Sequence, residues 1–130
     1  MNNLMAILWN GIAQIEYDRN KPLPDYQGAY LDKMDQKMAT GIEVDGRMVN
    51  NPDLGQRAQF VAANLAHAIL SNNEPLAAAM STWLAERMTD LQQVKISGQE
   101  EQELSIELVF DEPYVKQVPV TFDLLKKRQN

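Results

Sequence analysis

The sequence has 130 residues, the length of one ordinary domain, with 45% hydrophobic and 23% charged residues. It contains no cysteine, which excludes disulfide bonds, thiolate catalysis and zinc sites with cysteine ligands. Its net charge is −6, and an acidic chain repels phosphate backbones, so we expect no nucleic-acid partner. No apolar run approaches the ~18 residues of a membrane span, and the apolar first residues lack the basic region of a signal peptide. We therefore expect a cytoplasmic protein without a membrane segment.

Residues 3–17 are predicted to form the first helix. Their apolar side chains recur at helical spacing, at Leu4, Ile7, Leu8, Gly11, Ile12 and Ile15. Gly11 lies in the middle of this stripe, where glycine costs up to about 1 kcal/mol relative to alanine in a helix. We expect another helix backbone to approach closely at that point.

A second helix is predicted over residues 26–39, after a loop that contains two prolines. Residues 42–49 then carry a clear turn, Asp45-Gly46 between apolar residues, which predicts a small β-hairpin. A two-residue loop would pair residues 44 with 47 and 42 with 49.

The longest predicted helix spans Asn51–Ser71, with Asn51 as its N-cap and Pro52 in its first turn. One face is apolar at helical spacing, with Leu54, Ala58, Val61, Leu65 and Ile69. The opposite side is also largely apolar, with Phe60, Ala63, Ala66, His67 and Leu70. A helix that is apolar on two sides needs contacts on two sides.

A fourth helix begins at Asn73 or Glu74 and runs to Thr89, and its short connection predicts an antiparallel helical hairpin with the helix before it. The hydrophobic period then changes to two, which predicts strands at 94–96, 104–110 and 118–122. The predicted fold class is α+β: four helices followed by a three-stranded antiparallel sheet, with a small hairpin after helix two. Residues 1–125 form a single domain, and residues 126–130 are a basic tail.

The sequence offers little for catalysis. His67 is the only histidine, and Ser71 lies one helical turn away, but no third group orients the pair. Phosphate-binding glycine loops and metal-ligand motifs do not occur. We therefore assign no catalytic residues, metal or cofactor, and we favour a protein that is not an enzyme.

Two functional hypotheses follow from these patterns. The first is an interaction or accessory module that binds a second copy of itself, or another cytoplasmic protein, through the second face of the long helix. Its binding residues are Phe60, Ala63, Asn64, His67 and Leu70.

The alternative is a binder of small anions or carboxylates, or an enzyme, with a pocket near Arg87, Trp83 and a tyrosine such as Tyr30. It depends on Arg87, which falls on the apolar face of the fourth helix, where a guanidinium needs a partner. An internal carboxylate beside Arg87 would remove the support for this pocket.

Overall fold

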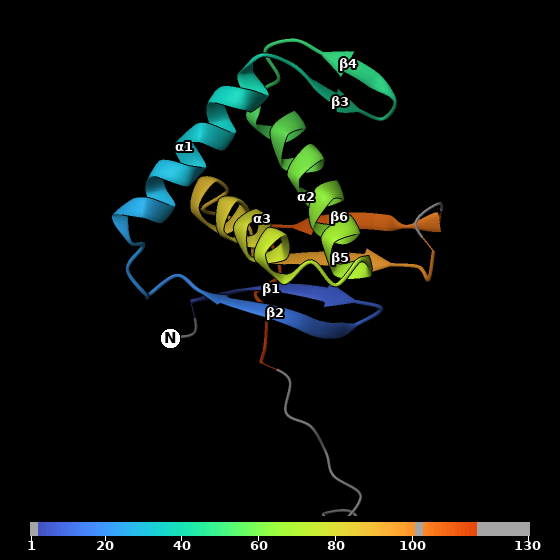
Figure 1. The fold of residues 1–130 in the computed structure, drawn as a ribbon. Helices are drawn as coiled ribbons and strands as arrows, with labels where there is room; N and C mark the ends of the chain where they lie inside the picture. The colour runs from blue at the N-terminus through green and yellow to red at the C-terminus, as the bar shows by residue number, and fades with distance from the viewer. Residues whose placement is uncertain (1–2, 101–102, 117–130) are drawn as a thin grey trace, which may run out of the picture.

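The computed structural model describes residues 3–100 and 103–116 of the chain. Within these ranges the chain forms three helices and six strands (Figure 1). In chain order they are β1 Leu4–Trp9, β2 Ile12–Asp18, α1 Asp25–Ala39, β3 Ile42–Val44, β4 Arg47–Val49, α2 Leu54–Leu70, α3 Glu74–Arg87, β5 Gln93–Ser97 and β6 Ser105–Val109.

A mixed four-stranded sheet with the order β2-β1-β5-β6 supports the helices. β1 is central and runs parallel to β5, whereas the β1–β2 and β5–β6 pairs are antiparallel. Figure 1 shows all three helices on one side of this sheet and the separate β3–β4 hairpin at the far end of α1 and α2. The parallel β1–β5 pair is joined by a crossover that contains every helix of the described chain, as parallel pairing requires a long connection.

The predicted helix over residues 3–17 is wrong, because this segment is the β1–β2 hairpin. Its turn is Asn10-Gly11, and both residues have positive φ, 49° and 85°. This backbone conformation is the reason for an Asn-Gly turn in a hairpin. A Cβ on Gly11 would meet nothing within 4 Å, so no helix approaches it. The Asn10 side chain instead exchanges two hydrogen bonds with the Gly98 backbone, at 3.0 and 3.1 Å.

The predicted three-stranded antiparallel sheet and the count of four helices are therefore also wrong. The strands predicted at 94–96 and 104–110 are confirmed as β5 and β6, but β1 and β2 complete a mixed sheet beside them. The predicted strand at 118–122 and the basic tail at 126–130 lie outside the described residues.

The other elements follow the sequence closely. The hairpin at 42–49 is confirmed, with the expected Ile42–Val49 and Val44–Arg47 pairs. α2 begins later than predicted, because Asp53 and not Asn51 is the N-cap, and its side chain forms a capping box with Gln56. α2 and α3 pack against each other across a three-residue connection. In the described part of the chain, no helix has the length and apolar character needed to cross a membrane.

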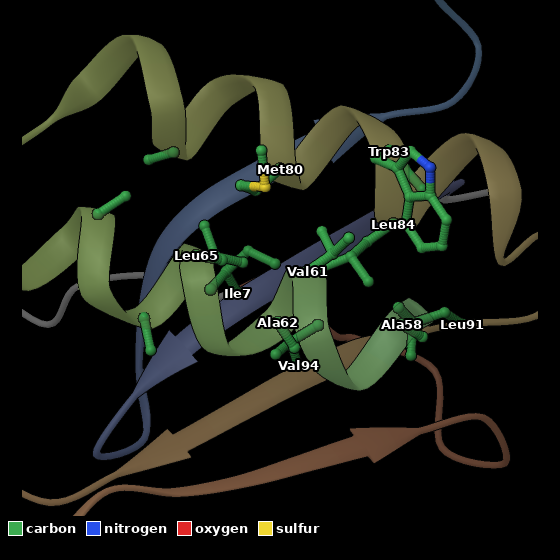
Figure 2. Close-up of a cluster of buried hydrophobic side chains, with 14 of the residues drawn as sticks. Ile7, Ala58, Val61, Ala62, Leu65, Met80, Trp83, Leu84, Leu91 and Val94 are labelled. Atoms are coloured by element: carbon green, nitrogen blue, oxygen red, sulfur yellow. The ribbon is translucent and has the colours of Figure 1, made fainter. Parts of the chain in front are cut away.

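The core lies between the sheet and helices α2 and α3. Figure 2 shows it as a cluster of side chains from the sheet, the helices and the connection before β5. Ile7 and Val94 come from the sheet, Leu91 comes from the connection, and the helices contribute Ala58, Val61, Ala62, Leu65, Met80, Trp83 and Leu84. On the opposite face of the sheet, Tyr114 packs on Ala6 and Leu8, and its hydroxyl donates to Glu16 Oε2 at 2.6 Å. β1 is therefore buried on both faces.

Candidate functional site

Arg87 and Trp83 join α3 to α1. Arg87 Nε lies 2.9 Å from Asp35 Oδ2, and its Nη2 lies 2.9 Å from Asp32 Oδ1. The indole Nε1 of Trp83 donates to the other oxygen of Asp35, Oδ1, at 2.8 Å, and the Trp83 side chain is fully buried. Asp35 thus holds two residues of α3 at once. The guanidinium has its internal carboxylates, so the hypothesis of an anion pocket at Arg87 and Trp83 loses the observation that supported it.

His67 and Ser71 do not form the arrangement of a base and a nucleophile. Ser71 Oγ donates to the backbone carbonyl oxygen of His67 at 2.9 Å, which makes it a cap at the end of α2. Across residues 3–100 and 103–116, no three His, Asp or Glu side chains gather in a way that could hold a metal ion.

The second face of α2 divides into two flanks. Phe60 and Asn64 turn toward α1, where Phe60 packs against the core and Asn64 Nδ2 donates to the Phe60 carbonyl at 2.8 Å. Both line a cleft of about 370 Å³ between the helices. Its other walls come from Tyr30, Met34, Lys37, Met38, Gly41, Ile42, Val61 and Met80. This flank is thus largely covered within one molecule.

The other flank faces solvent. We call it the outer face of α2, and it consists of Ala63, His67 and Leu70 from the predicted second face together with Gln59, one residue from each successive turn. Ala66, which was also predicted on this face, is buried in the core instead. The four residues of the outer face are all exposed, and Leu70 retains 38% of its accessible surface.

None of these four residues is Asp, Glu, Lys or Arg, although the whole chain has a net charge of −6. The exposed side of α1, by contrast, has Asp25, Asp32, Lys33 and Lys37. An uncharged exposed stripe is unusual on a protein of this charge, since exposed helix faces are usually rich in charged residues.

An open groove of about 550 Å³ lies beside the outer face, between α2 and β6. We call it the β6 groove. α2 contributes Gln59, Ala62 and Ala63, and the other wall is formed by Leu104, Ile106, Glu107 and Leu108, with Asp45 at one end. The small alanine side chains on α2 leave room for another backbone to approach closely.

β6 forms one edge of the sheet. In the part of the chain that the structure describes, β5 pairs with one side of β6 and no strand pairs with the other. Its pairing with β5 is regular from Ser105 to Val109, without a bulge, and the strand contains neither lysine nor proline. Bulges, lysine and proline are features that commonly protect an edge strand from pairing with another chain, and β6 lacks all three; Glu107 is its one charged residue.

Two ionisable groups with perturbed pKa values, Tyr17 and Arg19, lie where β2 meets α3. Burial, reinforced by a 3.1 Å hydrogen bond to Glu86, raises the pKa of Tyr17 to about 12. Burial also lowers the pKa of Arg19, which donates to the carbonyl oxygens of Ala85 and Met88 at the end of α3. These contacts fix β2 and the segment after it to α3.

Periodicity along α2 identified five candidate binding residues. The structure leaves Ala63, His67 and Leu70 exposed, and it turns Phe60 and Asn64 toward α1. Periodicity did not identify the wall of the groove on β6, although the alternation of Leu104, Ile106 and Leu108 was visible. What was missing was the order of the sheet, β2-β1-β5-β6, which places β6 at an edge among the described strands. Comparison of the chain with protein-family models, with curated proteins and with solved structures finds no match.

Proposed function

We propose that this chain is a non-enzymatic interaction module that acts as a homodimer, with the outer face of α2 at the interface. The observation that supports the proposal is the uncharged, exposed stripe of α2 beside the β6 groove. Charged residues are depleted at the centres of protein interfaces, where their desolvation is costly.

Self-association explains why this stripe is uncharged. In a two-fold dimer, each residue near the axis meets a second copy of the same surface. A charge at such a position would meet its own like charge, and each chain already has a net charge of −6. Gln59 and Ala63 avoid this repulsion, and the small side chain of Ala63 permits close approach of two helices.

The test is the mass in solution, measured by light scattering over a range of concentrations. We expect twice the 14.7 kDa of one chain at high concentration. Gln59→Glu adds one charge to the outer face with almost no change in size, and it should raise the dimer dissociation constant at least about tenfold, the equivalent of ~1.4 kcal/mol.

A matched control is Gln36→Glu, the same substitution at an exposed position of α1. It should leave the dissociation constant unchanged. A monomer at every concentration, or equal effects of the two variants, would rule out a dimer through this face. Phe60→Glu is a poor test, because Phe60 contributes to the core of each molecule.

A second candidate function is the binding of a small apolar carboxylate in the cleft between α1 and α2. The cleft of about 370 Å³ falls in the range of ligand pockets. Its lining is apolar apart from Tyr30, Lys37 and Asn64, and the lysine could attract a carboxylate. This candidate predicts that medium-chain fatty acids raise the melting temperature of the wild type more than that of Lys37→Gln.

A further inference from the structure

We infer that β6 of one protomer pairs antiparallel with β6 of a second copy, with Ile106 at the two-fold axis. The two four-stranded sheets would then join at their β6 edges into one continuous sheet. This inference rests on the proposed homodimer and specifies how its two chains meet.

The two-fold symmetry restricts how the strands can pair. Leu104, Ile106 and Leu108 face α2, because their neighbours Val94 and Ile96 on β5 lie in the core under the helices. A two-fold axis perpendicular to the sheet leaves the helix-covered faces of both protomers on the same side of the joined sheet. A residue on the helix side of one β6 must therefore lie opposite a residue on the helix side of the other β6. Both copies of α2 then lie on the same side of the joined sheet, with their outer faces directed toward each other.

The extent of the groove and the charge on β6 select the register. The apolar wall of the β6 groove, Leu104, Ile106 and Leu108, is centred on Ile106, whereas a pairing centred on Leu108 would run into the bend at Phe110 and Asp111. An axis at Glu107 would place this carboxylate directly opposite Glu107 of the second copy, and like charges opposite each other destabilise a strand pair. An axis at Ile106 places Glu107 opposite Ser105 of the second copy, whose hydroxyl can donate to the carboxylate. On the helix side, Leu104 then faces Leu108, and Ile106 meets its own copy.

This register also fills the β6 groove. The groove is lined by Ile106, Leu108 and the alanines of α2, and it opens at the strand edge. In the joined sheet, the Ile106 and Leu108 side chains of the second copy lie next to this opening and cover apolar surface that one molecule leaves accessible. The second copy therefore supplies both a backbone partner for β6 and apolar side chains for the groove.

Disulfide cross-linking tests this register with little background, because the chain has no cysteine. Residues opposite each other in an antiparallel pair have Cα atoms about 4.5–5.5 Å apart, within the range of a disulfide, whereas residues displaced by two positions lie beyond it. Ile106→Cys should therefore form a disulfide-linked dimer under mild oxidation, seen as a shift to twice the chain mass on a non-reducing gel. Gln36→Cys, at an exposed site on α1, measures collisional cross-linking.

A second experiment guards against poor folding of Ile106→Cys. Leu104→Cys and Leu108→Cys chains should cross-link with each other when mixed, and neither should cross-link with itself. Light scattering on the same samples distinguishes a wrong register from the absence of a dimer. A dimer by mass that does not cross-link at Ile106, or in the mixture, overturns the register and leaves the proposed homodimer intact. A monomer by mass overturns both, and it would mean that the β6 edge has another occupant or none.

Discussion

Asp35→Ala should destabilise the fold far more than a surface substitution. In the native structure the two oxygens of Asp35 accept from different residues of α3, Arg87 Nε at 2.9 Å and Trp83 Nε1 at 2.8 Å. Alanine removes both acceptors and leaves the rest of α1 unchanged.

The larger part of the expected cost comes from the indole. Trp83 is fully buried, and an N–H group left there without an acceptor costs about 1–3 kcal/mol. The ion pair adds about 1 kcal/mol or less, because the Arg87 and Asp35 side chains each keep 29% of their accessible surface. We therefore expect a loss of about 3 kcal/mol, which lowers the melting temperature of a domain of this size by roughly 10 °C.

The assay is urea and thermal unfolding followed by circular dichroism. Asp32→Ala is the control, since Asp32 bonds the same guanidinium but its side chain is 70% exposed, and it should cost less than about 1 kcal/mol. In a Trp83→Phe background, Asp35→Ala should lose most of its effect, because no indole N–H is left to satisfy. Equal destabilisation by Asp35→Ala and Asp32→Ala would refute the reasoning.

Three further outcomes follow from contacts elsewhere in the fold. Folding raises the pKa of Tyr17 from 10.0 to about 12, so the native state favours its neutral form. The contribution of Tyr17 to the free energy of unfolding is therefore complete below pH 10 and should be lost as the pH rises from 10 to 12. Urea unfolding of Tyr17→Phe over this range should show a weaker decline, and equal declines would contradict the assignment. Gly11→Ala places a side chain at φ 85° and should cost about 1 kcal/mol in the same assay. Tyr114→Ala should cost about 3 kcal/mol, whereas Tyr114→Phe, which keeps the ring and loses the bond to Glu16, should cost about 1 kcal/mol. Equal costs in the same assay would mean that the ring contributes nothing.

The β1–β2 hairpin shows why periodicity failed in one segment. β1 packs against the helices on one face and against Tyr114 on the other, so its residues are apolar without alternation. Such a run cannot be distinguished from a buried helix by its period. The decisive local signal was Asn10-Gly11, the same kind of turn that correctly identified the hairpin at Asp45-Gly46. The stripe of apolar residues across the turn matched helical spacing and outweighed that signal.

The candidate site could be predicted only in part, for a related reason. Helical spacing shows that Phe60 and Ala63 lie away from the main buried face of α2, but it does not show which neighbour covers each of them. Phe60 is partly covered because α1 lies beside it, and Ala63 is exposed beside β6, the last of the described strands on that side of the sheet. Both facts depend on contacts between segments far apart in the sequence, which no local pattern records.

The parallel pairing of β1 with β5 also determines when the molecule can fold during synthesis. Residues 6–9 pair with residues 93–96, so the centre of the sheet cannot form until β5, with all three described helices before it, has left the ribosome. Until then the β1–β2 hairpin exposes both apolar faces of β1, and an isolated hairpin is only marginally stable in water. Contacts between such distant segments slow folding, because the loop between them must be closed before they contribute. The nascent chain therefore passes through a long interval in which its most apolar strand is exposed and open to binding by a chaperone.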